Sequence, residues 1–382
     1  MTGQFALTDD QLAIQEMAQR FTADNITPHA SEWDEKSHFP RDVIQQTGEL
    51  GFGAIYVSEE SGGINLGRLE AALIMEAMAY GCPTTSAYIS IHNMAAWMID
   101  RFGSDDLKAR YLPKLVTMEH LASYALTEPG SGSDAAGLKT SAVLDGDHYV
   151  LNGTKQFISG GGYNDIYVVM VRTDDHKSKG ISCLVIEKDT PGFSFGKPEK
   201  KLGWNASPTA QLIFEDCRVP VANRVGAEGE GFRFAMAGLD GGRLNIGACS
   251  LGGAQRCLDE AVKYTKERKQ FDTPIADFQN TQFMLADMAT ELEAARALLY
   301  LAAAKVTENA PDKTRFSAMA KRLATDSGSN VVNNALQLFG GYGYLKEYPI
   351  ERFWRDLRVH SILEGTNQVM RMIVGRDMLR QG

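Results

Sequence analysis

Several features that are absent from this sequence exclude whole classes of protein. Only five cysteines occur among 382 residues, and none of them forms a Cys-x-x-Cys pair. An odd, scattered set of cysteines indicates buried thiols in a reducing compartment rather than a disulfide framework. No apolar run reaches the roughly 18 residues of a membrane-spanning helix, so we expect no membrane span.

Charge and histidine spacing exclude further classes of protein. The formal net charge is −9 and no block of five basic residues occurs, which argues against binding to nucleic acid or to an acidic membrane surface. The seven histidines show no His-Glu-x-x-His pattern and no mixed His/Cys spacing, so no metal site is expected.

The first residues bear on where the protein acts. Met1–Phe5 carry neither a basic n-region nor an Arg-rich presequence. We therefore expect action in the compartment of synthesis, which is the cytoplasm if the protein is prokaryotic. If the sequence is the mature form of a eukaryotic protein, we expect the mitochondrial matrix.

The hydrophobic period changes twice along the chain and predicts three domains. Residues 1–120 and 226–382 have apolar positions at helical spacing, whereas residues 121–225 form short runs rich in Val, Ile, Phe and Tyr. Strands without helices between them favour antiparallel pairing. We expect an α+β protein with an N-terminal helical domain, an antiparallel β-barrel or sandwich, and a C-terminal helical bundle.

Local signals predict some elements more closely. One helix is expected from Asp9 to about Glu35, and one long helix over Gly231–Arg268. In the β-region, Asp145-Gly146 and Asn152-Gly153 are expected as turns on either side of the strand His148–Leu151, because both dipeptides favour hairpins.

A loop rich in glycine and hydroxyl groups, Leu126–Asp134, follows the predicted strand Leu121–Leu126. Glycines let a ligand approach backbone N–H groups, and the hydroxyls add uncharged donors. The loop fits neither standard nucleotide motif: Ala135 replaces the third glycine of the dinucleotide fingerprint, and no P-loop lysine follows. A cofactor loop of another lineage and an ordinary turn both remain open.

Two further glycine clusters allow a structural and a functional interpretation. Phe157 and Ser159 precede three glycines and place a ring beside a hydroxyl, although a core phenylalanine in a loop is the simpler interpretation. Gln337–Tyr344 contains glycines that can simply end a helix.

Arg268, at the end of the long helix, could bind a phosphate or complement the helix dipole.

Glu364 is the candidate acid or base. It lies between Leu363 and Gly365, just before a predicted helix. Most glutamates are solvated surface groups. The aliphatic neighbours here favour partial burial, which would raise the pKa toward the range of a useful base.

Together and in this order, these segments resemble the acyl-CoA dehydrogenase family over essentially the whole chain. The motifs are Ala125–Asp134, Gln156–Gly160, Arg268–Phe271 with Gln279, Gln337–Gly343 and Glu364–Gln368. The resemblance implies that family's fold: a helical domain, a middle β-barrel and a C-terminal four-helix bundle. Within the family it is nearest to members acting on isobutyryl-CoA, through Gly203–Gly226, Gly238–Ala254, Gly340–Tyr348 and Arg358–Arg371.

The resemblance implies FAD as cofactor. The strand-end loop and Phe157–Ser159 would enclose the flavin ring, and the Arg268 and Gln337 segments would contact the pyrophosphate and adenosine across a subunit boundary. The implied cofactor residues are Ala125, Leu126, Thr127, Gly132, Ser133, Phe157, Ile158, Ser159, Arg268, Phe271, Gln279, Gln337, Leu338, Gly340, Gly341, Thr366, Asn367 and Gln368.

The resemblance also assigns the reaction. Glu364 would remove the α-proton of an acyl-CoA while the β-hydrogen leaves as hydride to the flavin. Some relatives place the base where Gly242 stands here, and glycine cannot act. The implied substrate residues are Ser133, Asp240, Arg243, Leu363, Gly365 and Arg376. Leu363 replaces a tyrosine common in longer-chain members, and one methylene is worth only ~1–3 kcal/mol of selectivity.

The implied partners are an electron-transfer flavoprotein as acceptor and further copies of the chain in a homotetramer, a dimer of dimers. We expect isobutyryl-CoA, converted to methacrylyl-CoA in valine breakdown, as substrate. A straight or 2-methyl-branched short acyl-CoA, such as butyryl-CoA or 2-methylbutyryl-CoA, is the alternative. Two other classes are an acyl-CoA oxidase and a flavin-free scaffold that has kept only the fold.

Overall fold

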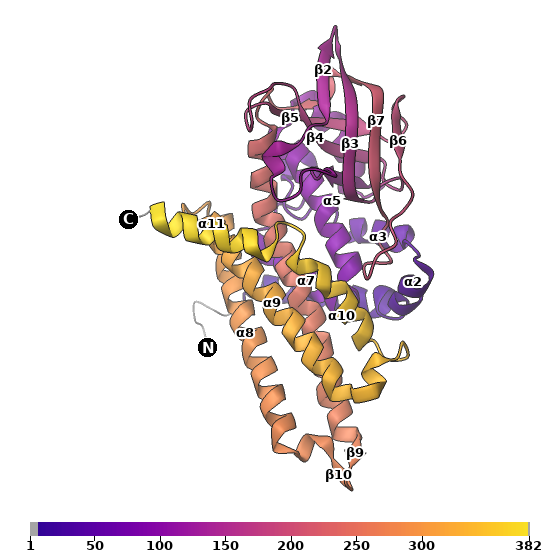
Figure 1. The fold of residues 1–382 in the computed structure, drawn as a ribbon, viewed down its shortest axis with the longest axis vertical. Coiled ribbons are helices and arrows are strands. Elements are labelled where there is room, and N and C mark those ends of the chain that lie inside the picture. The colour runs from indigo at the N-terminus through magenta and orange to yellow at the C-terminus, as the bar shows by residue number, and fades with distance from the viewer. Residues whose placement is uncertain (1–6, 381–382) are drawn as a thin grey trace.

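The computed structural model describes residues 7–380, with helical segments at both ends of the chain and a β-domain between them (Figure 1). Met1–Phe5, on which the expected location depends, lie outside the described residues. Helix gives way to strand between Val116 and Ala122, and helix resumes at Gly231.

The N-terminal helices differ from the prediction at one place. They are α1 (Asp9–Phe21), α2 (Ala30–Lys36), α3 (Arg41–Gln46), α4 (Arg68–Gly81), α5 (Pro83–Phe102) and α6 (Asp105–Val116). The single helix predicted from Asp9 to about Glu35 is wrong, because a π-helical turn over Thr22–Ile26 and a break separate α1 from α2. Pro28 stands at the break, where its missing N–H and its ring oppose a continuous helix.

The eight strands of the β-domain form one sheet in the order β6-β7-β3-β2-β4-β5-β8, with β1 paired to β4. The strands are β1 (Ala122–Ala125), β2 (Ser141–Asp145), β3 (His148–Ser159), β4 (Ile166–Arg172), β5 (Ile181–Glu187), β6 (Phe193–Phe195), β7 (Thr209–Pro220) and β8 (Arg224–Val225). Most strand pairs are antiparallel, as expected. Two pairs depart from the expectation, because β1 pairs with β4 in parallel and β2 meets β4 in parallel at Ser141 and Arg172. The β2–β3 hairpin lies between β1 and β4 in sequence and supplies the long crossover that parallel pairing needs.

Of the two predicted turns in this domain, one is confirmed. Asp145 pairs with His148 across the β2–β3 hairpin, with Gly146 at φ 63°. Asn152-Gly153 is not a turn: it lies inside β3, where the register with β7 shifts between Leu151 and Gly153. Gly153 has φ 146°, and a Cβ there would lie 2.7 Å from the Cα of Thr140. The dipeptide therefore marks a β-bulge at a close approach of two strands.

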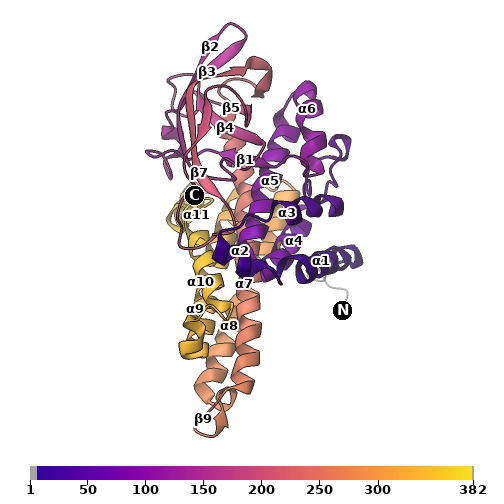
Figure 2. The same ribbon diagram turned by 90° about the vertical axis from the view of Figure 1, so that its right-hand side faces the viewer.

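The C-terminal helices follow the predicted pattern. They are α7 (Gly231–Glu267), α8 (Gln279–Thr307), α9 (Lys313–Phe339), α10 (Ile350–Arg358) and α11 (Asn367–Arg380). Figures 1 and 2 show α7 running from the β-domain to the far end of the bundle, where the small hairpin of β9 (Lys269–Gln270) and β10 (Thr273–Pro274) leads into α8. Helix α7 packs against α4, α8 and α9. Gly252 permits the contact with α4, since a Cβ there would lie 2.0 Å from the carbonyl oxygen of Glu76.

All five cysteines are free and buried, which confirms the prediction of buried thiols. No helix within residues 7–380 is long and apolar enough to cross a membrane. Over the same residues no three His, Cys, Asp or Glu side chains gather in a way that could hold a metal ion.

Candidate active site

Glu364 lies in a short loop between the 3-10 turn η8 (Val359–Ser361) and α11, with an unusual backbone. Glu364 has φ 56° and Gly365 has φ 90°, so a non-glycine residue occupies the left-handed region. Such a conformation costs about 1–3 kcal/mol and persists only where neighbours hold it. Arg243 Nε donates to the Glu364 carbonyl at 3.3 Å, and Lys321 Nζ donates to the Gly365 carbonyl at 2.9 Å.

The Glu364 carboxyl is buried although the residue as a whole is partly exposed. Its Oε2 atom is inaccessible to solvent and has no hydrogen-bond partner among the described residues. Burial raises the pKa of Glu364 to about 7, against the opposing charges of Arg243 and Lys321. The predicted burial and raised pKa are therefore confirmed, and the carboxylate form of this group is available near neutral pH.

Gly242 on α7 lies directly against this carboxyl. A Cβ at position 242 would lie 2.7 Å from Oε2 and 3.0 Å from Cδ of Glu364. The two positions where relatives are expected to carry the base therefore converge on the same space. Because Gly242 has no side chain, the Glu364 carboxyl occupies that space in this chain.

Two phenols near Glu364 carry no sequence signal. The Tyr124 hydroxyl is buried without a partner among the described residues, and burial together with the nearby Glu364 charge raises its pKa well above the usual range. Burial likewise raises the pKa of Tyr56, whose ring lies 3.6 Å from the guanidinium carbon of Arg68. Both residues lie in parts of the chain far from position 364, so only the tertiary fold brings them to the base.

A cleft of about 900 Å³ opens between the N-terminal helices and the bundle. Glu364 itself does not line it, but Arg243, which donates to the Glu364 carbonyl, does. Asp240 and Arg243, both predicted to bind substrate, line it and form an ion pair at 2.7 Å. The Thr314 hydroxyl donates to the other oxygen of Asp240 at 2.7 Å. Basic side chains outnumber acidic ones in the wall, because Arg68, Arg101 and Lys313 join Arg243 there. Between them the lining is largely apolar, with Leu66, Trp97, Phe102, Met236 and Val306. An elongated anionic ligand with apolar segments would fit such a surface.

Two other predicted substrate residues differ in their surroundings. Leu363 is partly buried and packs against the main hydrophobic core. Arg376 is exposed on α11 and lies outside the lining of this cleft. The structure therefore brings together Asp240, Arg243 and the Glu364 loop but not Arg376.

The glycine and hydroxyl loop after β1 is held by a buried ion pair that sequence reasoning missed. Lys155 Nζ lies 2.7 Å from Glu128 Oε1, and both side chains are buried. The two Glu128 oxygens also accept the backbone N–H groups of Lys139 at 2.6 Å and Thr140 at 2.9 Å. The ordinary-turn interpretation does not account for a buried charge pair beneath the loop. Above it, Gly132 and Ser133 are exposed, and a Cβ at Gly132 would meet nothing within 4 Å.

The other segment expected to enclose the flavin ring, Phe157–Ser159, adjoins this loop. The Gln156 N–H donates to the Thr127 carbonyl at 2.8 Å, which ties β3 to the loop. Phe157 has φ 59° at the bulge where the β3–β7 register shifts, and its side chain is 65% exposed. Ile158 is buried, whereas Ser159 is partly exposed. The interpretation of Phe157 as a core residue is therefore wrong, because the bulge turns its ring outward.

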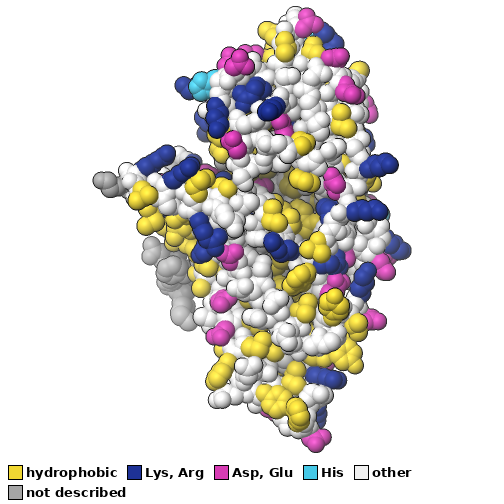
Figure 3. All heavy atoms as spheres, in the orientation of Figure 1, with side chains coloured by type: hydrophobic (Ala, Val, Ile, Leu, Met, Phe, Trp, Pro, Cys, Tyr) yellow, Lys and Arg dark blue, Asp and Glu magenta, His cyan; other side chains and the backbone are white. Residues whose placement is uncertain are grey.

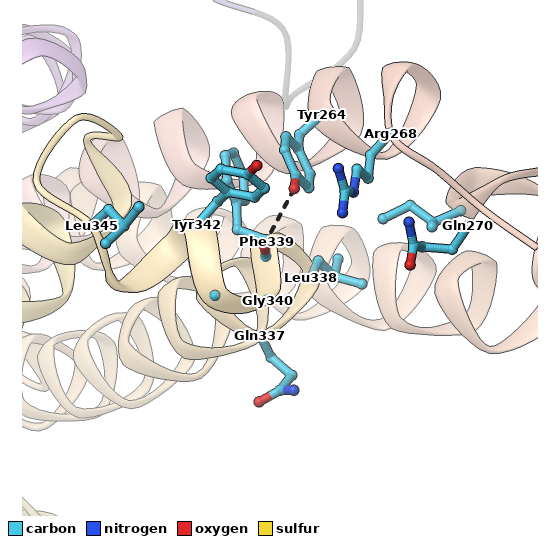
Figure 4. A pocket seen from close by; sticks show the side chains of 11 residues that line it. Tyr264, Arg268, Gln270, Gln337, Leu338, Phe339, Gly340, Tyr342 and Leu345 are labelled. Atoms are coloured by element: carbon cyan, nitrogen blue, oxygen red, sulfur yellow. Dashed lines mark hydrogen bonds between the residues drawn. The ribbon is translucent and has the colours of Figure 1, made fainter.

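A separate cavity of about 550 Å³ lies at the far end of the bundle. It is lined by Arg268 from the end of α7 and by the turn Gln337–Tyr342 after α9. Figure 4 shows Arg268 pointing toward the end of α9, while Gln337 extends away from it. Gly340 has φ 58° and ψ −137°, which only glycine adopts easily, and a Cβ there would meet nothing within 4 Å. Glycine here therefore ends the helix and also keeps the cavity wall open.

The predicted cofactor residues are thus divided between two ends of one chain. Helix α7 has 37 residues and is roughly 55 Å long at 1.5 Å per residue. Its first residue, Gly231, lies against Ser182 of β5, and Arg268 follows its last residue. Figure 1 shows α7 extending from the β-domain to the far end of the bundle. Phe271, 91% exposed, and Gln279 lie near Arg268 but outside the cavity lining. Within one chain, the cavity lined by Arg268 therefore does not meet the loop Leu126–Asp134.

Beside the base, the cofactor residues expected in α11 have differing environments. Thr366 caps α11 by accepting the Val369 N–H at 3.2 Å, and Gln368 is exposed. Asn367 is buried, and its side chain bonds to Lys321, Thr325 and Asp326. Its amide is thus engaged within the protein, which leaves only its backbone free for a cofactor contact.

Comparison with known proteins covers almost the whole chain. Three family descriptions match in order: the N-terminal domain of acyl-CoA dehydrogenase over residues 8–119, the middle domain over 123–217 and the C-terminal domain over 229–379. The mitochondrial isobutyryl-CoA dehydrogenase of Dictyostelium discoideum is 57% identical over 97% of this chain and 90% of its own length. That of Bos taurus is 54% identical over 98% of this chain and 90% of its own length.

Solved structures agree with this fold. Butyryl-CoA dehydrogenase from Megasphaera elsdenii has a TM-score of 0.96 at 40% identity, covering 99% of this chain and 100% of its own. A chain solved in work on the electron transferring flavoprotein of Acidaminococcus fermentans has a TM-score of 0.97 at 45% identity, with 99% and 100% covered. An FAD complex of PigA has a TM-score of 0.95 at 30% identity, covering both chains completely.

Proposed function

The chain belongs to the acyl-CoA dehydrogenase family, and from that premise we propose that it dehydrogenates isobutyryl-CoA to methacrylyl-CoA with FAD, in valine breakdown. The observation that carries the proposal is the buried Glu364 carboxyl, which has a pKa of about 7 and lies against Gly242. The 54–57% identity to two isobutyryl-CoA dehydrogenases supports the substrate. Butyryl-CoA remains the alternative, supported by a relative of that name at 40% identity.

The described residues fit FAD at two places. The exposed Gly132 and Ser133, with the outward ring of Phe157, suit a flat heteroaromatic ring. Arg268 beside the open glycines Gly340 and Gly341 suits a pyrophosphate, because guanidinium groups bind phosphate oxygens bidentately. When bound, FAD supplies the acceptor for the β-hydrogen. The FAD complex of PigA supports this cofactor.

The chain's own residues perform the proton transfer. Below its pKa the Glu364 carboxyl holds a proton, and above it the carboxylate is ready to accept the α-proton of the acyl group. An acyl chain in the cleft would exclude water from this carboxylate and make it more basic. The Glu364 N–H is the proposed donor to the thioester oxygen, where negative charge develops; such donors contribute a few kcal/mol. Asp240 and Arg243 would hold the CoA portion.

The division of the cofactor residues between two ends of the chain supports a homo-oligomer, which we propose is a tetramer. Arg268 of one copy would then meet the glycine loop of another. Exposed apolar side chains near this end favour such contacts, namely Phe271, Phe283 and Tyr344, which are 91%, 58% and 84% exposed. Figure 3 shows further apolar groups spread over the bundle surface in the region of α9 and α10. We propose an electron-transfer flavoprotein as acceptor, supported by the Acidaminococcus fermentans chain.

The substrate proposal is tested with the purified protein, a redox dye and a panel of isobutyryl-, butyryl- and 2-methylbutyryl-CoA. We expect a yellow protein whose flavin absorbance is bleached anaerobically, with the highest kcat/KM for isobutyryl-CoA. A higher kcat/KM for butyryl-CoA would replace the substrate but not the reaction. A protein that stays colourless after FAD addition would contradict the function, and rapid turnover with O2 alone would indicate an oxidase.

A further inference from the structure

Lys321, on α9, is a fully buried cation that the reaction as described does not use. The other fully buried lysine, Lys155, has a carboxylate at 2.7 Å, whereas no ion pair within 4 Å involves Lys321 among the described residues. Burial lowers the pKa of Lys321 to about 8. An unpaired buried ammonium is expensive, so its retention calls for a specific role.

The hydrogen bonds of Lys321 lead to the base loop. Its Nζ donates to the Gly365 carbonyl at 2.9 Å and to Asn367 Oδ1 at 2.9 Å. These two acceptors follow Glu364 in sequence and bracket the transition from the left-handed loop into α11. The Asn367 amide in turn donates to Asp326 at 2.6 Å and to Thr325 at 2.9 Å. Residues 321–326 of α9 thereby hold the chain directly after the base, where the loop enters α11.

The positive charge of Lys321 also acts on the Glu364 carboxyl. Lys321 and Arg243 are the cations that oppose the effect of burial on Glu364. Arg243 is paired with Asp240, which offsets part of its field. No carboxylate lies within 4 Å of Lys321 among the described residues, and Asp326 opposes its charge only from farther away. The other titratable groups facing this site are Asp326 on α9, His360 in η8, and the phenols Tyr56 and Tyr124. Burial keeps His360 neutral by lowering its pKa to about 3, so it adds no charge at neutral pH.

We propose that Lys321 is the positioning residue of the catalytic base: it holds the left-handed loop through Gly365 and Asn367, and its positive charge favours the carboxylate form of Glu364. This rests on the proposed function, in which Glu364 accepts the α-proton. It explains why a lysine occupies a helix face otherwise made of small residues, Ser317, Ala320, Ala324 and Gly328. Lys321 does not touch the substrate and acts through Glu364.

The test compares Lys321→Met with Lys321→Arg and uses the pH dependence of kcat/KM for isobutyryl-CoA in the flavin-containing protein. Without the cation the carboxylate is less favoured, so the acid limb should move up by about one pH unit. At a pH on the acid limb, kcat/KM of the variant should therefore be roughly tenfold lower than that of the wild type, and the difference should disappear at higher pH. Lys321→Arg should restore the profile. The control is Lys263→Met, which removes an exposed lysine of α7 that forms no ion pair within 4 Å among the described residues, and it should leave the profile unchanged.

Several outcomes would overturn the proposal. A purely structural lysine would lower kcat or flavin content at every pH without moving the limb. Lys321→Gln, which is smaller and keeps a donor, guards against a folding defect in the methionine variant and should give the same shift. If both neutral variants fail to retain flavin while Lys321→Arg is normal, the charge serves stability instead. Glu364→Gln in the same assay separates the two claims: an active Glu364→Gln contradicts the proposed base, whereas an inactive one with an unmoved Lys321→Met profile contradicts only the role of Lys321.

Discussion

Gly242→Ala should displace the Glu364 carboxyl without changing the chemistry of that group. The new Cβ would lie 2.7 Å from Oε2, 3.0 Å from Cδ and 3.3 Å from Oε1 of Glu364. Ordinary contact begins at 3.4 Å, so the carboxyl must move by about 0.7 Å, the difference between 3.4 and 2.7 Å. The obstructed atoms are the end of a flexible side chain, so the fold itself should tolerate the methyl group.

The expected cost is catalytic. A misplacement of about 1 Å in an active site can cost ~100-fold in rate, or about 2.7 kcal/mol. Alanine at this helix-interior position should stabilise the helix by up to ~1 kcal/mol, so lost activity cannot be attributed to unfolding. We therefore expect kcat/KM to fall by one to two orders of magnitude with normal flavin content and melting temperature.

The assay is anaerobic flavin bleaching by isobutyryl-CoA, followed by steady-state dye reduction. Gly375→Ala is the matched control, because it is also a helix glycine and its Cβ would meet nothing within 4 Å. That variant should retain full activity. If Gly242→Ala keeps wild-type kcat/KM, the close approach of Gly242 to the base has no functional meaning and the site is wrongly assigned.

Three other predictions concern the cofactor and the base. Arg268→Ala should lose flavin and dissociate the oligomer, as measured by the 450 nm absorbance per chain and by size-exclusion chromatography; unchanged flavin content would refute its phosphate role. Lys155→Met should leave Glu128 buried and unpaired at a cost of about 3–5 kcal/mol, seen as a lower melting temperature and weaker flavin retention. In the wild type, kcat/KM should fall as the pH drops below about 7, because protonation of Glu364 removes the base; a limb near the ordinary glutamate pKa would contradict the burial effect.

Local sequence patterns predicted the helices better than the sheet. The predicted helix Gly231–Arg268 agrees with α7 to within one residue, because its 3.6-residue periodicity and end signals lie within the segment itself. The parallel pairing of β1 with β4 depends on strands about forty residues apart, and no local pattern specifies it. Asn152-Gly153 has the same dipeptide signature as a hairpin turn, and only its pairing with β7 shows that it is a bulge.

The candidate site, too, could be predicted from the sequence only in part. Glu364 and Arg268 stand in recognisable motifs, so the sequence could nominate them, but their separation by the length of α7 appears only in the fold. Tyr124 lies in the short strand Ala122–Ala125, and nothing in that four-residue segment points to the base. Lys321 has a signal that could have been used: it stands among small residues at helical spacing, where a lysine is unusual if that face is buried. Its partner, however, depends on how α9 packs against the base loop.

The central claim is that Glu364 removes the α-proton, and Glu364→Gln tests it most directly. The amide keeps the size and shape of the side chain but cannot accept the proton. The measurement is anaerobic mixing of the flavin-containing variant with isobutyryl-CoA, monitored at 450 nm. We predict that the flavin spectrum is perturbed by binding but not bleached, with reduction slowed by at least ~1,000-fold. Bleaching at a rate close to the wild type would show that another group removes the proton.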